Sequence, residues 1–273
     1  MKKILFPLLI TLLLFGCVIE SNDLPRIKVS GEVVKETIDL DNFTKLMIAG
    51  PMNIVIDQNE GNRADVETYE SLMSLFRAEI IDDMLILYIL NPNRSEEFHI
   101  ESDIDRISSY AVISGSRIKW PNNKKILNVH LSVDDLDEIT VIGECNITTA
   151  QPFESEELNL EVAGALHLDA DLYVQDFNVE IAGACNLELR GSSTNFNVEC
   201  AGAGTIEAYK FISDNVTIEI AGVCNAEVYA RESINVEIAG LGTVKYMGDA
   251  HTVNFDKAGI GKIVKIESED IEL

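Results

Sequence analysis

Carboxylate side chains recur at a near-constant interval in the second half of this sequence. Each stands three residues before a glycine, and the six positions are Glu161, Glu180, Glu199, Glu219, Glu237 and Asp256. Calcium takes its ligands from carboxylate oxygens, so such a row could bind Ca²⁺. The row could instead be a solvated face whose charge keeps sheets of different molecules from pairing. We favour the solvated face, keep calcium as the alternative, and predict no other cofactor.

Four cysteines lie in the same half of the sequence, and three of them stand two residues after a glycine: Cys145, Cys185 and Cys224. Because these three recur in alternate repeats, strand spacing would hold their backbones about 9–10 Å apart, too far for a disulfide. Cys200 takes a position that isoleucine fills elsewhere. We predict that all four are free, buried thiols. A metal site would need closer spacing, such as CxxC, and histidines nearby.

Histidine and basic residues are too scattered to indicate a catalytic centre. Residues 131–239 contain 21 acidic residues and only three basic ones. A hydrolase needs an acid and a base that converge on one bond, whereas these acidic residues follow the repeat. His99, His130 and His251 have no triad-like neighbours in the sequence. We therefore expect a protein that is not an enzyme, with no catalytic residues.

The element that positions these residues is a repeat of about 19 residues. Seven segments align on one glycine, at intervals of 21, 19, 19, 20, 18 and 19 residues. A fixed period of this length predicts a solenoid. An eighth, isolated copy covers residues 47–54. The aligned glycines are Gly143, Gly164, Gly183, Gly202, Gly222, Gly240 and Gly259.

Polar and apolar residues alternate around each glycine, as in Asn178-Val179-Glu180-Ile181, and helical periodicity is absent. Each repeat is therefore predicted to contain a strand, a glycine turn, a second strand and a looser turn such as residues 189–193. The glycine would supply a positive φ or a close backbone approach. The predicted fold is all-β: a two-sheeted β-superhelix, or β-solenoid.

Two further columns follow from the alignment. The position three residues after the glycine is predicted to form a hydrogen-bonded polar ladder, which includes His167. Its members are Asn146, His167, Asn186, Thr205, Asn225, Thr243 and Lys262. In the last repeat Lys257 and Lys262 replace the usual residues, and with Lys245 and Lys265 they make this end basic. We predict that these charges cap the open edge.

The N-terminus has the pattern of an exported lipoprotein. Residues 1–16 combine Lys2 and Lys3 with a short apolar run, which is typical of a signal peptide. The run ends in Leu14-Phe15-Gly16-Cys17, which resembles a bacterial lipobox and implies lipidation of Cys17. Residues 17–27 would then form a tether that holds the protein at the membrane.

Acidic residues dominate the whole chain. The net charge is −25 over the full sequence, and removal of residues 1–16 would make it −27. Such a chain is not expected to bind nucleic acid, whose phosphates attract basic proteins. Anionic polysaccharide should be repelled as well, unless a cation bridges the two.

Residues 28–273 are expected to form a single domain, with an irregular part at 28–130 and regular repeats at 131–266. Strands are predicted within Phe43–Ile56 and Met84–Leu90, and a single helical turn within Ser71–Phe76. Residues 101–124 are predicted to be a loop with a poor strand, and Trp120 is predicted to pack in the core.

The sequence resembles the head GIN domain family over residues 30–266. The resemblance rests on residues 43–58, on residues 84–87, and on residues 127–143 followed by the glycine repeats. It implies an adhesin of the autotransporter type, found as an outer-membrane lipoprotein in gut Bacteroidetes. The family turn is Gly-Ser-Gly, whereas this chain has Ala-Gly-Ala-Cys or Ala-Gly-Leu-Gly.

Three functions are compatible with this reading. The first is a surface-displayed adhesion module of the cell envelope that binds a protein or glycan, as a single chain or a homo-oligomer. The second is a structural or assembly protein of the envelope. The third and least favoured is a polysaccharide-active enzyme, because some of these share a β-helix.

Overall fold

The computed structural model describes residues 26–59, 61–92 and 117–267. Cys17, the predicted signal peptide and His99 lie outside the described residues, as does most of the predicted tether. Among the residues described, no helix is long and apolar enough to cross a membrane.

The N-terminal part contains short strands and two short helical turns. It comprises β1 (Ile27–Lys28), β2 (Val33–Asp39), β3 (Lys45–Ala49), β4 (Met52–Gln58), β5 (Arg63–Tyr69), α1 (Glu70–Met73), β6 (Phe76–Ile81), β7 (Met84–Ile89), β8 (Ile118–Lys119), a 3₁₀ turn (Pro121–Asn123) and β9 (Leu127–Val133). The predicted strands and the helical turn are thus confirmed, although α1 begins one residue early and Gly50 separates β3 from β4.

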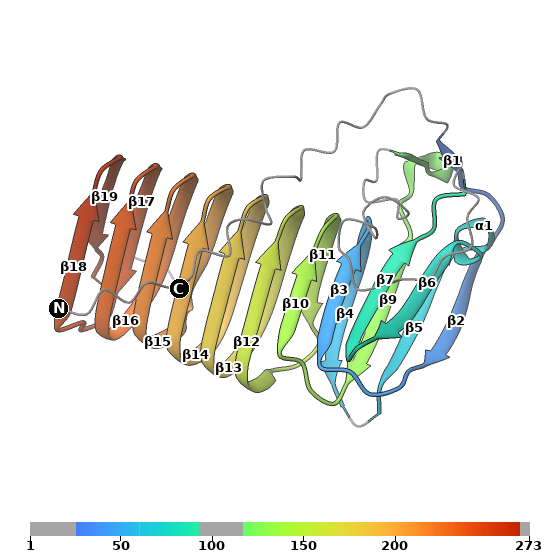
Figure 1. Ribbon diagram of the computed structural model, residues 1–273, viewed down its shortest axis with the longest axis horizontal. Coiled ribbons are helices and arrows are strands. Elements are labelled where there is room, and N and C mark those ends of the chain that lie inside the picture. The colour runs from blue at the N-terminus through green and yellow to red at the C-terminus, as the bar shows by residue number, and fades with distance from the viewer. Residues whose placement is uncertain (1–25, 60, 93–116, 268–273) are drawn as a thin grey trace.

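The second half is a β-solenoid of about seven turns. Its strands are β10 (Glu138–Val141), β11 (Glu144–Thr149), β12 (Phe153–Val162), β13 (Ala165–Ile181), β14 (Ala184–Cys200), β15 (Ala203–Ile220), β16 (Val223–Ile238), β17 (Leu241–Met247), β18 (Thr252–Lys257) and β19 (Ile260–Lys265). Consecutive coils stack in parallel, as Figure 1 shows. β13 and β14 pair without a register shift, whereas the β14–β15 and β15–β16 ladders shift register near the second corner. The predicted fold class is confirmed.

The second corner of each central coil differs from the prediction. We expected a looser turn near residues 189–193, but β14 runs through this corner without interruption. Ser192 pairs with Tyr173 on one side and Ile212 on the other, so the ladder continues around the bend. At Gly191 the backbone of this coil has a φ of +106°, whereas Leu172 and Phe211 take the equivalent positions in the neighbouring coils without a positive φ. Each central coil is therefore one long bent strand.

The isolated eighth copy forms a coil of the same stack. β3 pairs with β10 and β4 pairs with β11, so that Ile48 lies beside Val141 and Met52 beside Cys145. On its other side this coil contacts β7 and β9. The order of coils in space thus departs from the order of the sequence, with residues 45–58 inserted between two later segments.

Antiparallel strands lie at this end of the stack. β5 pairs with both β2 and β9, and β6 pairs with β7. Trp120 packs against the main core and lies beside Tyr69, with ring centroids 6.4 Å apart. The prediction that Trp120 packs in the core is confirmed in part, because its side chain is half-buried and packs against the edge of the core. These elements enclose the end of the stack opposite to β18 and β19 (Figure 1).

The glycine turns owe their glycines to close contact between coils. A Cβ added at Gly202 would lie 2.0 Å from the backbone oxygen of Gly183, and the same clash recurs from Gly164 to Gly259. The backbone of each turn also donates to the turn before it, as Ala203 N does to Gly183 O over 2.9 Å. Close approach, rather than a positive φ, is therefore the requirement at these turns.

Candidate functional site

The six predicted carboxylates form one row on the outside of the solenoid. In the strand register Glu161 pairs with Glu180, and the pairing continues through Glu199, Glu219 and Glu237 to Asp256. All six residues are exposed. Because like charges on adjacent strands repel, the row adds no stability when it is ionised.

Substituting Glu199 with glutamine is expected to stabilise the fold at pH 7 and to change little near pH 4. Partial burial, and then the Glu180 carboxylate, raise the pKa of Glu199. The folded chain therefore holds this proton more tightly than the unfolded chain, and stability falls as the pH rises from the ordinary value of 4.5 through the raised pKa. After solvent screening, we expect a gain of about 0.5 kcal/mol at neutral pH.

Urea unfolding at the two pH values measures this effect. Glu232→Gln is the matched control, because Glu232 is exposed but lies outside the row. An equal gain in stability from both substitutions would show that repulsion within the carboxylate row does not destabilise the fold.

The row does not gather into a metal centre in the structure. Within the described ranges, no group of three or more His, Cys, Asp or Glu side chains comes close enough to hold a metal ion. The calcium interpretation stays a prediction, as does the solvated face.

The predicted polar ladder forms only in part. Asn186 Nδ2 lies 3.1 Å from His167 Nδ1, and the Thr243 backbone N donates to Asn225 Oδ1 over 3.1 Å. Asn146 on β11 donates to Asn53 on the neighbouring strand β4 over 2.8 Å. His167 is thus a ladder member, as predicted. Only the stacking of β4 on β11 reveals the link to Asn53.

Two longer ladders escaped the sequence analysis. In the first, Asn197 donates to Asn178 and Asn178 to Asn159, each over 2.9 Å. This row lies two residues before the carboxylate row. The second row lies near the other corner and joins Asp176, Asn195, Asn215 and Ser233. Asparagine recurs five residues before the turn glycine, and this recurrence in the sequence could have predicted the first ladder.

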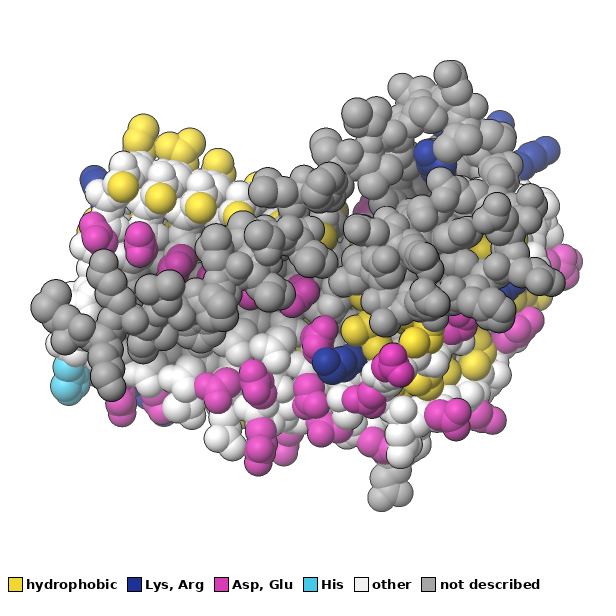
Figure 2. Space-filling view, in the orientation of Figure 1, with side chains coloured by type: hydrophobic (Ala, Val, Ile, Leu, Met, Phe, Trp, Pro, Cys, Tyr) yellow, Lys and Arg dark blue, Asp and Glu magenta, His cyan; other side chains and the backbone are white. Residues whose placement is uncertain are grey.

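The glycine corner carries an exposed apolar ridge. The residue after each glycine points outward, and its side chain grows from Ala203 to Val223, Leu241 and Ile260. The last three are 51%, 45% and 75% exposed. Figure 2 shows hydrophobic side chains aligned along the edge of the solenoid, with acidic side chains over the flank below.

The four cysteines are free and buried, as predicted. Burial raises the pKa of Cys185 to about 12, so this thiol stays protonated and unreactive at neutral pH. One contact was missed: the Cys200 and Cys224 side chains interact across the glycine corner, and both sulfurs border the space that a Cβ at Gly204 would fill, at 3.4 and 3.2 Å. The spacing argument compared only residues of one column, whereas these two sulfurs meet across the corner.

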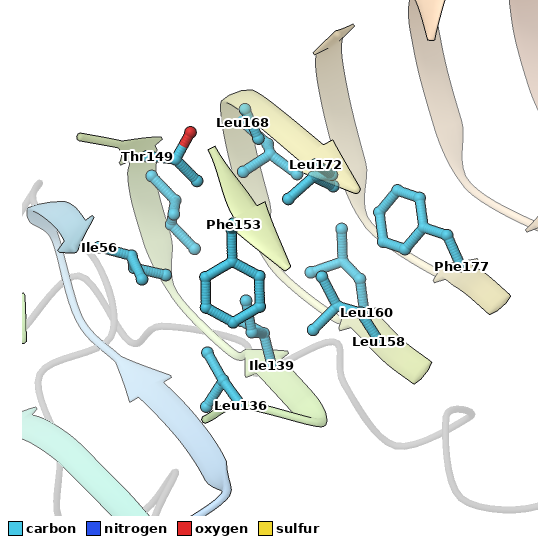
Figure 3. Close-up of a pocket in the computed structure, with 12 residues that line it drawn as sticks. Ile56, Leu136, Ile139, Thr149, Phe153, Leu158, Leu160, Leu168, Leu172 and Phe177 are labelled. Atoms are coloured by element: carbon cyan, nitrogen blue, oxygen red, sulfur yellow. The ribbon is translucent and has the colours of Figure 1, made fainter. Parts of the chain in front are cut away.

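The interior offers no built catalytic pocket in the described part of the chain. One cavity lies where β4, β10, β11, β12 and β13 meet, and Figure 3 shows that its walls are almost entirely hydrocarbon. Its volume of about 20 Å³ holds little more than one water molecule. On the outside, His130 Nε2 lies 3.4 Å from Asp57, with both side chains partly exposed.

The fold and surface define a β-solenoid protein with a filled apolar interior and ordered polar rows on its outside. The chain belongs to the family described as "Putative auto-transporter adhesin, head GIN domain", whose sequence pattern matches residues 42–250. No curated protein matches the chain.

Several solved structures share the fold. A "putative adhesin" of Bacteroides fragilis is 21% identical, covers 88% of this chain and 100% of its own, and gives a TM-score of 0.71. A "Putative lipid binding protein" of Parabacteroides distasonis is 17% identical and gives a TM-score of 0.64. The match covers 88% of this chain and 99% of that protein. A "putative adhesin" of Parabacteroides merdae is 17% identical and gives a TM-score of 0.52. The match covers 89% of this chain and 100% of that protein. At these identities the likeness establishes the fold.

Proposed function

We propose that this protein is a lipid-anchored, non-catalytic binding module of a bacterial cell envelope, displayed at the surface for adhesion. Membership of an adhesin-type family supports a binding role. The proposal rests mainly on the location of the ordered polar groups, which the repeat places on the outer surface of the solenoid. Its hydrogen-bonded amides and its carboxylates line the outside of the coils, while the interior is packed with apolar side chains.

The chemistry of the flank favours a neutral or cationic ligand. Thr217, Glu219, Asn235 and Glu237 line a shallow surface hollow between β15, β16 and β18. Amides and carboxylates at strand spacing can accept and donate hydrogen bonds to the hydroxyl groups of a glycan or to a peptide. The negative charge would repel an anionic polymer. A neutral glycan or a protein surface is therefore the ligand class we propose.

A Cys17→Ser substitution is expected to abolish lipid attachment. The thiol of Cys17 is the acceptor in the lipobox-like sequence, and serine in its place offers no thiol for a thioether. Metabolic labelling with an alkyne fatty acid should mark the wild-type protein and not the variant, and the variant should move from the membrane fraction to the soluble fraction. Cys145→Ser is the control, because Cys145 is buried. Undiminished labelling of the Cys17 variant would refute the anchor.

Proteolysis of intact cells separates surface display from an internal structural or assembly role in the envelope. A displayed chain is degraded by added protease while a periplasmic marker survives. Protection of the chain until the outer membrane is permeabilised would overturn surface display and favour the structural alternative.

A further inference from the structure

A shallow trough runs along the solenoid beside the glycine corner. Its two walls are the apolar ridge and the polar ladder, which occupy alternate outward positions of the same strands. It consists of two surface hollows that share Val223 and Asn225 and are therefore continuous. The trough crosses β11, β13, β14, β15, β16, β17 and β19. At the usual strand spacing it is roughly 29 Å long.

One wall of the trough is apolar. In the central coils it consists of alanine side chains, and toward the C-terminal end it consists of Val223, Leu241 and Ile260. These last three side chains are 51%, 45% and 75% exposed. Covering hydrocarbon that stands so far out in water is favourable. The ridge therefore offers a ligand a continuous apolar contact instead of a single anchor.

The opposite wall is polar. Asn225 Oδ1 accepts a hydrogen bond from the Thr243 backbone over 3.1 Å, which leaves the Nδ2 group of this amide for a ligand. The hydroxyls of Thr205 and Thr243 have no hydrogen-bond partner in the described part of the chain. Hydroxyls both donate and accept, and an amide offers both functions as well. Because such groups recur along the wall at coil spacing, they suit a ligand that carries hydroxyls at a regular interval.

Charge is nearly absent from the trough, although the chain is strongly acidic. Of the described residues that line it, Glu144 is the only carboxylate and Lys262 the only ammonium, and they lie at opposite ends. Further carboxylates, at Glu188, Glu207 and Glu227, lie two residues beyond the polar ladder. They would repel an anionic polymer, and a cationic polymer would find no partner within the central coils of the trough. The trough is therefore matched to a neutral ligand.

An extended peptide fits this surface less well. Peptides that bind in extended form often pair with the open edge of a sheet. The trough instead crosses the faces of central strands whose backbones already pair on both sides, as β15 does with β14 and β16. Recognition here must use side chains. A sugar ring carries C–H groups on its faces and hydroxyls around its rim, which matches an apolar wall beside a polar one.

We propose that the trough binds a linear neutral glycan laid along the axis of the solenoid, with ring faces on the apolar ridge and hydroxyls bonded to the polar ladder. This inference rests on the proposed binding role and assigns it a second surface, across the glycine corner from the hollow at Thr217. Each coil repeats both walls, so successive sugar units meet equivalent contacts. Affinity should therefore rise with the length of the glycan.

Fluorescence anisotropy with the full chain tests the proposal. The probes are labelled cellohexaose, xylohexaose, mannohexaose and maltohexaose, with a hexasaccharide of galacturonic acid as the anionic comparison. We expect at least one neutral probe to bind saturably, with an affinity that added salt leaves unchanged. The disaccharide of the same sugar should bind at least about tenfold more weakly. The anionic probe should not bind.

Removal of the apolar wall should weaken this binding. Leu241→Ser combined with Ile260→Ser takes away the most prominent hydrocarbon of the ridge, and we expect a loss of at least about tenfold in affinity. Val33→Ser is the matched control, because Val33 is 41% exposed on β2, outside the trough. Thermal melts establish that each variant is folded.

Removal of hydroxyls from the polar wall is the second test. Thr205→Val combined with Thr243→Val keeps the shape of both side chains, and should weaken binding at least about fivefold. Thr194→Val combined with Thr252→Val is the matched control. It makes the same two changes at exposed positions of β14 and β18, near the other corner of the coil.

Several results would overturn the proposal. Failure of every neutral probe to bind, equal affinity for the anionic probe, or equal weakening by a control would each do so. Weakening by Thr217→Val and by neither wall variant would place the glycan in the hollow at Thr217 instead. Self-association that depends on the ridge and excludes the glycan would assign the trough to a second copy of the chain.

These outcomes are separable from those of the proposed function. Loss of lipid labelling or surface display concerns the anchor and leaves glycan binding by the purified chain intact. Conversely, a chain that is labelled, displayed and adherent yet binds none of the neutral probes would disprove the trough alone.

Discussion

Alanine in place of Gly202 is expected to destabilise the solenoid by about 3 kcal/mol, the upper end of the usual cost of overpacking, without altering any polar group. The added methyl carbon would lie 2.0 Å from the carbonyl oxygen of Gly183. The backbone cannot rotate away as a side chain can, so the clash can be removed only if the two coils separate. That separation would stretch the turn bonds, including Ala203 N to Gly183 O at 2.9 Å. Chemical unfolding followed by circular dichroism measures the loss.

Gly204→Ala is the matched control for this prediction. It makes the same substitution two residues away, where the new carbon would meet the sulfurs of Cys224 and Cys200 at 3.2 and 3.4 Å. Side-chain rotation can accommodate such contacts, so the cost should be clearly smaller. Similar losses at both positions would show that contact between glycine turns does not limit the stacking.

Truncating Phe196 to alanine should cost about 3–5 kcal/mol of unfolding free energy. Phe196 is fully buried in a cluster of three phenylalanine rings inside the solenoid. Its ring stacks on Phe177 at 5.5 Å and meets the edge of Phe211 at 5.4 Å. The substitution leaves a large cavity between coils that are fixed by their ladders and cannot close in on it. Urea titration of the variant measures the loss.

Phe255→Ala supplies the comparison within the same protein. This residue holds an inward position, but at the open end it is 39% exposed, so little contact is lost. We expect a change below about 1 kcal/mol. A loss as large as that of Phe196→Ala would mean that the end coil is covered in solution and would contradict the open edge.

The repeat could be predicted from the sequence because the structure imposes one strict local demand on each coil. Only glycine fits where the turn backbones touch, so the glycines kept their interval and revealed the period. Alternation of polar and apolar residues then assigned the inner and outer faces. The buried cysteines and the carboxylate row followed from these two patterns.

The remaining features depend on contacts that periodicity does not encode. The bend at Gly191 keeps its ladder, and a local sequence of small polar residues predicts a turn whether or not the ladder continues. Cys200 and Cys224 meet across a corner, which requires the geometry of the turn. Val253 and Phe255 have the pattern of core residues, and their exposure follows only from the absence of a described coil beyond them.

The position of β3 and β4 within the stack makes the two ends of the molecule unequal. These strands lie between β7 and β9 on one side and β10 and β11 on the other, which are far apart in sequence. The coil of residues 45–58 cannot leave without breaking two interfaces at once. At the opposite end, β18 and β19 are each held by one neighbour. Local opening of a repeat array spreads from its weakest terminus, so this molecule should fray in one direction, from its C-terminal coil inward.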